Sequence, residues 1–169
     1  MKKLQSTLIL SFILFTSAYG QDDDTAWFDF WIGKWEVSWT EAEGKLGKGT
    51  NTVTKILDDK VIQENFKIVE GANKGYLGTS MSVYSPKFKI WHQAYADNQG
   101  GYINFIGERS GDTRIFKTDP SQDKSVPLSR MRFYEIKKDS LMWDWEFSQD
   151  GGKTWTLNWR ITYKRIGEG

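Results

Sequence analysis

Residues 28–39 read Phe-Asp-Phe-Trp-Ile-Gly-Lys-Trp-Glu-Val-Ser-Trp, and the spacing of their apolar side chains changes at the glycine. Before the glycine the aromatic residues crowd together, which predicts a short helical turn capped by Thr25. After it, Trp35, Val37 and Trp39 alternate with polar residues, as in a strand with one buried face. The stretch therefore predicts a helical turn followed by the first strand of a sheet.

The rest of the chain continues the strand pattern, with Gly, Asp, Asn and Pro turns between short segments. We expect ten strands, at 34–41, 48–57, 60–69, 75–84, 88–96, 101–109, 112–119, 128–138, 140–148 and 154–164. Strands joined by short links pair with their chain neighbours, and closing the sheet removes its exposed edges. The predicted fold is therefore all-β, an antiparallel up-and-down β-barrel of about ten strands, with a β-sandwich as the alternative.

The composition of the 169-residue chain limits its function. With no cysteine and one histidine, it has no ligand set for an iron–sulfur cluster, a thiolate zinc site or a multi-histidine metal site, so no metal is predicted. The formal net charge of +1 gives no electrostatic case for nucleic acid. The expected partner is a small molecule, and the oligomeric state stays open.

Residues 1–20 are typical of a secretory signal peptide, with a positively charged start, an apolar run from Leu8 to Phe15, and small residues before the cleavage site. The apolar run is too short to span a bilayer comfortably, although a retained anchor is the alternative. We expect one domain over residues 21–169, exported to the periplasm or the exterior of a bacterium, without a stable membrane anchor.

Two local motifs carry structural predictions. Gly33-Lys34-Trp35, at the start of the first strand, resembles the lipocalin and calycin signature, in which the tryptophan plugs the closed end of the barrel. Residues 148–155 fit the Asp-box pattern S-x-D-x-G-x-T-W; its specified positions include Ser148, Asp150, Gly152 and Trp155. In such a turn the aspartate accepts hydrogen bonds from backbone N–H groups. Because a sialidase propeller carries several copies and this chain has one, we interpret the motif as a structural hairpin.

From Phe28 to Arg165 the chain resembles an uncharacterised family of secreted bacterial calycin-like domains. The matching stretches are 28–37, 49–51, Glu64, 78–82, Trp91 with Gln93, Gly100, Arg132 and 148–155. The resemblance implies the calycin-like barrel and no particular reaction. More distant calycin relatives, namely lipocalins, fatty-acid-binding proteins and haem-binding nitrobindins, imply a ligand cavity inside it.

The alternation of side chains suggests which residues line that cavity. Glu64 shares a strand face with large apolar residues, where a carboxylate is costly to bury unless it is paired. If these faces point inward, Arg132 would pair with Glu64. We predict that the cavity binds a small, partly apolar ligand through Glu64, Trp91, Gln93, Tyr95, Arg132 and Tyr134. A structural ion pair or plain surface charges are the alternative.

Three other hypotheses stay open. A carboxyl group in an apolar pocket has a raised pKa and can act as a general base, so Glu64 is the candidate catalyst of an isomerase, cyclase or hydrolase. No cofactor is predicted, but His92 could hold haem as a single axial ligand. Trp143 and Trp145 would stack on sugars, or serve a protein interaction, if they pointed outward; their alternation is more typical of a core.

Overall fold

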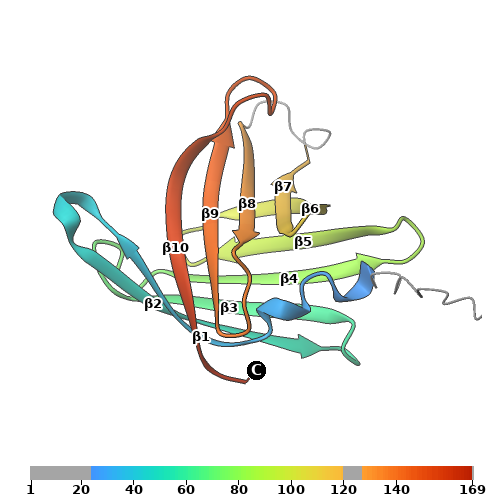
Figure 1. Cartoon of the computed structure of the whole chain (residues 1–169), viewed down its shortest axis with the longest axis horizontal. Helices are drawn as coiled ribbons and strands as arrows, with labels where there is room; N and C mark the ends of the chain where they lie inside the picture. The colour runs from blue at the N-terminus through green and yellow to red at the C-terminus, as the bar shows by residue number, and fades with distance from the viewer. Residues whose placement is uncertain (1–23, 120–126, 169) are drawn as a thin grey trace, which may run out of the picture.

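The computed structural model describes residues 24–119 and 127–168, which form a closed ten-stranded antiparallel barrel (Figure 1). The strands are β1 Gly33–Thr40, β2 Leu46–Ile56, β3 Val61–Glu70, β4 Leu77–Ser85, β5 Ile90–Asp97, β6 Tyr102–Ser110, β7 Thr113–Thr118, β8 Leu128–Tyr134, β9 Ser140–Ser148 and β10 Thr156–Gly167. Each strand pairs with its chain neighbours, and β1 pairs with β10 to close the ring. The predicted up-and-down barrel is confirmed, and the sandwich is wrong because closure leaves one continuous sheet.

Three short 3₁₀ turns accompany the strands: η1 (Asp24–Ala26), η2 (Asp29–Trp31) and η3 (Ala42–Gly44). The first two form the predicted helical segment before β1, but Thr25 lies inside η1 and does not cap it. Figure 1 shows these turns, in blue, to the right of the lower ends of β8–β10, with η2 beside the connection from β8 to β9. The predicted signal peptide, residues 1–20, lies outside the described residues.

The N-terminal turns fill one end of the barrel with aromatic side chains. Phe28 is fully buried and stacks on Phe116, with ring centroids 4.2 Å apart. Trp35 is also fully buried, and its indole N–H donates to the carbonyl of Trp31 at 2.8 Å. This end of the barrel is therefore filled by aromatic side chains.

Arg165 of β10 covers the same closed end. Its guanidinium lies over the Trp35 ring, 4.0 Å from the centroid. It donates to the carbonyls of Ile32 at 2.5 Å and Phe30 at 3.0 Å. Since both carbonyls belong to the segment that enters β1, one side chain of the last strand fixes the N-terminal turns on the barrel.

The burial pattern shows which side chains enter the barrel. On β1 and β3 every second residue is buried, including Trp35, Val37 and Trp39 on β1. On β10 a bulge between Leu157 and Trp159 shifts the alternation. Trp159 stays inside, whereas Leu157 pairs with Glu146 and is exposed, so the residues on either side of the bulge lie on different faces of the sheet.

Candidate functional site

A cavity of about 600 Å³ opens at the end of the barrel opposite the N-terminal turns. Strand β1 begins at the closed end with Gly33 and reaches the cavity with Trp39 and Thr40. The lining comprises Trp39, Thr40, Glu41, Glu64, Ile68, Ala72, Asn73, Tyr76, Tyr95, Asp97, Gln99, Ile103, Phe105, Met131, Trp143, Trp145, Asn158 and Trp159. It is a concave site in which seven of the eighteen lining residues are aromatic and polar groups lie among them, a combination found in small-molecule pockets.

Glu64 places a carboxyl group on the inner wall of this cavity. Its side chain is held by two hydrogen bonds, from the Asn51 amide to Oε1 at 2.7 Å and from the Ser80 hydroxyl to Oε2 at 2.7 Å. The Asn51 amide also donates to the Tyr163 hydroxyl at 3.2 Å. Asn51 and Ser80 lie on β2 and β4, the two neighbours of β3, so the carboxyl is held from both sides of its own strand, and Tyr163 of β10 bonds to Asn51 behind it.

The carboxyl of Glu64 lacks a counter-charge. None of the ion pairs found in residues 24–119 and 127–168 includes it. Burial raises the pKa of Glu64 to about 7, against the lowering effect of the hydrogen bonds from Ser80 and Asn51. The group is therefore close to half-ionised at neutral pH, where it can accept a proton or pair with a cation.

Tryptophans of β1, β9 and β10 form another part of the cavity wall. Trp159 packs edge-on against Trp39 and Trp143, with ring centroids 5.1 and 5.8 Å apart. Trp143 stacks parallel to Trp145. Because these rings contact one another from β1, β9 and β10, the wall is held in place before any ligand enters.

A chain of hydroxyl groups runs from the inner wall to the cavity mouth. The hydroxyls of Tyr95 and Tyr76 contact each other, and Tyr76 donates to Asp97 Oδ2 at 3.0 Å. Burial raises the pKa of Tyr95, whereas backbone N–H bonds from Gly101 and Gln99 lower the pKa of Asp97. The mouth therefore holds an ionised carboxylate next to two neutral phenols.

Four of the six predicted ligand contacts lie inside the barrel, at different depths. Tyr95 lines the cavity with Glu64. Gln93 is buried between the cavity and the closed end, and its amide donates to Ser82 at 2.9 Å. Trp91 belongs to the aromatic plug, where its indole N–H donates to the carbonyl of Asp24 at 2.7 Å. The prediction that Trp91 and Gln93 line the cavity is therefore wrong.

Arg132 and Tyr134 do not enter the barrel at all. On β8 it is Met131 and Phe133 that point inward, which places Arg132 and Tyr134 outside. The predicted pair between Arg132 and Glu64 is wrong, because Arg132 bonds to a different acid on its own side of the sheet.

The outer acids are Asp144 and Glu146 of β9. Arg132 Nη1 lies 3.2 Å from Glu146 Oε1, and the Tyr134 hydroxyl donates to Asp144 at 3.2 Å. Arg160 of β10 donates two further bonds of 2.8 Å to Asp144. These groups form a charge network across the outside of β8, β9 and β10, and Asp144 is fully covered by it.

The structure also contradicts two alternative hypotheses: haem binding by His92 inside the barrel, and sugar binding by Trp143 and Trp145 on its outer surface. His92 is exposed on β5, between the buried Trp91 and Gln93, so it faces away from the cavity and cannot ligate a haem there. Trp143 and Trp145 line the cavity and do not present an outer surface for sugars. No group of three or more His, Cys, Asp or Glu in the described ranges could hold a metal ion.

The 148–155 hairpin is held by its own polar side chains. Asp150 Oδ1 accepts hydrogen bonds from the backbone N–H groups of Lys153 and Thr154, at 3.0 and 2.9 Å. The Ser148 hydroxyl accepts one from the Gly152 N–H at 2.8 Å. The Trp155 ring lies 3.9 Å from the Arg130 guanidinium. These contacts organise a turn and bring no reactive group to the cavity.

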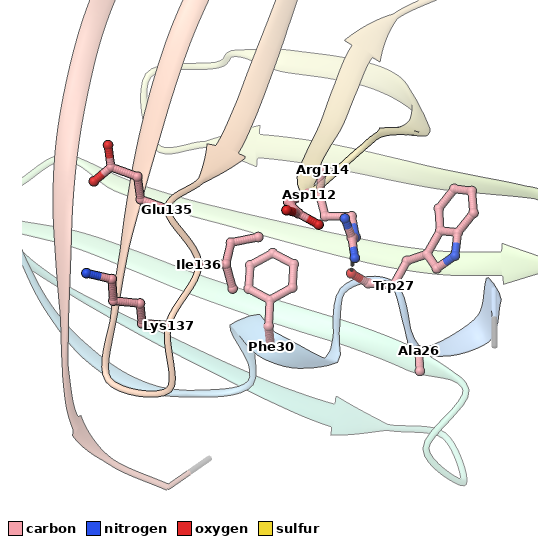
Figure 2. A pocket seen from close by; sticks show the side chains of 8 residues that line it. All are labelled: Ala26, Trp27, Phe30, Asp112, Arg114, Glu135, Ile136 and Lys137. Atoms are coloured by element: carbon pink, nitrogen blue, oxygen red, sulfur yellow. Dashed lines mark hydrogen bonds between the residues drawn. The ribbon is translucent and has the colours of Figure 1, made fainter. Parts of the chain in front are cut away.

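A second hollow, of about 590 Å³, lies outside the barrel beside the N-terminal turns (Figure 2). Phe30 and Ile136 face each other in it, and Arg114 donates to the carbonyl of Trp27 at 3.2 Å. Glu135 and Lys137 border it on the other side. No buried titratable group projects into this hollow, so the cavity with Glu64 is the better candidate.

Sequence reasoning missed the residues that hold Glu64. Asn51, Ser80 and Tyr163 sit on three separate strands, and only the register of the closed barrel brings them together. A weak signal was present, since Asn51 and Ser80 occupy inward positions where apolar residues are usual. Polar residues at buried strand positions point to a partner, but they do not identify it.

No protein-family model matches this chain, and no curated protein matches it. Among solved structures the chain is similar to a redesigned β-barrel, with 11% sequence identity and a TM-score of 0.45. The likeness covers 84% of this chain and 96% of that one, and it says nothing about function. No helix in residues 24–119 or 127–168 is long and apolar enough to cross a membrane.

Proposed function

We propose that the protein binds a small, partly apolar molecule inside the barrel, with the Glu64 carboxyl as its main polar contact. The observation that supports this is an aromatic cavity of about 600 Å³ with one buried, uncompensated carboxyl on its wall. That volume is in the range of cavities that enclose drug-sized ligands. Tyr95 and the tryptophans supply apolar contact area, and the closed end supplies a rigid base.

The proposal includes export from the cytoplasm. The sequence pattern of residues 1–20 supports a cleaved signal peptide, and the ligand would then be met in the periplasm or outside the cell. A binding protein in that setting captures, carries or buffers its ligand.

The test is native mass spectrometry of the protein purified gently from the periplasm of its own host. A reproducible added mass that is lost on denaturation is expected. Replacing Ile103, which lines the cavity, with tryptophan should abolish the added mass by filling the space. Tyr102→Trp is the matched control, because Tyr102 is the next residue on the same strand, is 65% exposed and points outward. Binding inside the barrel would be contradicted if the wild type carried no added mass, or if Ile103→Trp and Tyr102→Trp retained the added mass equally.

A second candidate function is general-base catalysis by Glu64, favoured by the burial of this carboxyl on the cavity wall, which raises its pKa to about 7. Such a base would remove a proton from carbon on the bound molecule. Incubating the recovered ligand with protein in D₂O should then introduce deuterium, and Glu64→Gln should stop the exchange while binding persists. Binding without any exchange would leave the protein a carrier.

A further inference from the structure

We propose that the ligand is an organic cation, with an ammonium group seated at Glu64 and an apolar body packed against the tryptophan wall. This inference rests on the proposed function and names its ligand class. It comes from three observations on the cavity: its charges, its free hydrogen-bond capacity and its aromatic rings.

The cavity lining is acidic and carries no positive charge among the described residues. Its ionisable groups that bear charge are the carboxyls of Glu41, Glu64 and Asp97, and no lysine, arginine or histidine joins them. An anionic ligand would face three carboxyls in a site of low dielectric. A cationic ligand would instead supply the counter-charge that Glu64 lacks.

The hydrogen-bond pattern around Glu64 also suits an ammonium group. Each carboxyl oxygen accepts one bond, from Asn51 or Ser80, although an ionised carboxylate has about four acceptor sites in all. Glu64, which lines the cavity, therefore keeps spare acceptor sites, whereas an ammonium brings three donors and needs no acceptor.

The tryptophan wall contributes in the same direction. The faces of indole rings attract cations more strongly than those of the other aromatic side chains. Trp39, Trp143 and Trp159 are locked edge-to-face, so ring faces as well as edges are presented around the space. An alkyl or aryl body gains apolar contact there, while its charged end is directed to the carboxyl.

The two other acids lie at the rim of the cavity and are already fixed. Glu41 accepts bonds from the backbone N–H of Ala72 and the indole N–H of Trp39, each at 3.1 Å. Asp97 is held by Tyr76 and by the turn that follows β5. Both stay in place as negative charges that raise the local concentration of cations at the entrance.

A matched series of probes tests the charge preference. Isothermal titration at about pH 8 would compare 4-phenylbutylamine, 4-phenylbutanol and 4-phenylbutanoate, which share a phenyl ring and an alkyl chain. The protein would first be unfolded in urea and refolded to empty its cavity. The amine should bind about tenfold or more tighter than the alcohol, the factor expected of a charge-assisted hydrogen bond, and the carboxylate should bind most weakly.

The variant Glu64→Gln should bind the amine only as tightly as it binds the alcohol. Its affinity for the alcohol should equal that of the wild type. Glu36→Gln is the control, because Glu36 is exposed on the outside of β1. An amine that binds no tighter than the alcohol or carboxylate, or that binds Glu64→Gln as well as the wild type, would refute the cation inference alone. Failure of all three compounds to bind the folded protein would refute the proposed function with it.

Discussion

Replacing Glu64 with glutamine should change how the stability of the empty protein depends on pH. In the folded barrel the pKa of Glu64 is about 7, against 4.5 for a free side chain. Between these values the folded protein keeps a proton that the unfolded chain releases. Raising the pH through this window therefore favours unfolding, and the loss of stability is complete above about pH 7. The side chain is 8% exposed, so solvent screens it little.

The size of the effect follows from the two pKa values. At about 1.4 kcal/mol for each pH unit that separates them, the ionised carboxylate costs about 3 kcal/mol of folding free energy at high pH. Since the unfolded group is partly ionised at about pH 5, the change between about pH 5 and about pH 8 is about 2–3 kcal/mol. Glutamine does not ionise and keeps an oxygen that Asn51 can donate to, so the variant should not show this loss.

Urea unfolding followed by tryptophan fluorescence measures the difference. The free energy of unfolding of Glu64→Gln minus that of the wild type should be small at about pH 5 and rise by about 2–3 kcal/mol at about pH 8. Tyr95 and Tyr163 do not titrate in this window, because burial raises the pKa of each well above its usual value. Glu36→Gln, altered on the outer face, should show no such change.

A raised pKa of Glu64 in the folded protein would be refuted if the difference in the free energy of unfolding between Glu64→Gln and the wild type were the same at both pH values. That result would mean that Glu64 titrates alike in the folded and unfolded chains, so that solvent or a counter-charge reaches it. A difference of the opposite sign, with the variant losing stability at about pH 8, would mean that the ionised form is stabilised inside the barrel.

Three further results are expected. Arg165→Lys should lower the free energy of unfolding by about 1–3 kcal/mol, because lysine cannot bond the carbonyls of Ile32 and Phe30 with one planar group; an unchanged urea midpoint would contradict this. Phe28→Ala should cost about 3–5 kcal/mol, as expected for a fully buried phenylalanine, and calorimetry should record a much lower Tm. The protein recovered from the periplasm should begin at Gln21, and an intact mass that includes residues 1–20 would exclude cleavage there.

The number and order of the strands could be predicted from the sequence because each strand is a local pattern. Alternating side chains and turn residues are set within ten residues or so, and neighbouring strands then pair without a choice of topology. The closed end was expected only from the resemblance of Gly33-Lys34-Trp35 to the calycin signature, because its packing partners include Trp91 and Phe116, which are distant in the chain.

The cavity side of β8 could not be predicted from its own residues. One face carries Met131 and Phe133, and the other carries Arg132 with Tyr134, so both hold large side chains. The choice is made by β9, whose outward Glu146 pairs with the arginines. Charge pairing between β8 and β9 thus determines which face of β8 points into the barrel, which the alternation along β8 alone does not.

The position of a residue along the barrel axis could not be predicted from the sequence either. Trp91, Gln93 and Tyr95 share one face of β5, yet they lie in the plug, in the middle and in the cavity. Alternation gives the face of a strand, whereas depth depends on which residues of the other strands lie at the same level. Glu64 was found because an acid among apolar neighbours is unusual wherever it lies.

The pairing of β1 with β10 determines when the barrel can close while the chain is being synthesised. The ring is incomplete until the last strand has been made, and Arg165, which secures the N-terminal turns, arrives with it. Contacts between the two ends of a chain are slow to form, because a long loop must close before they stabilise anything. The barrel therefore cannot close before β10 has left the ribosome, and the edge of β1 that β10 covers stays unpaired until then.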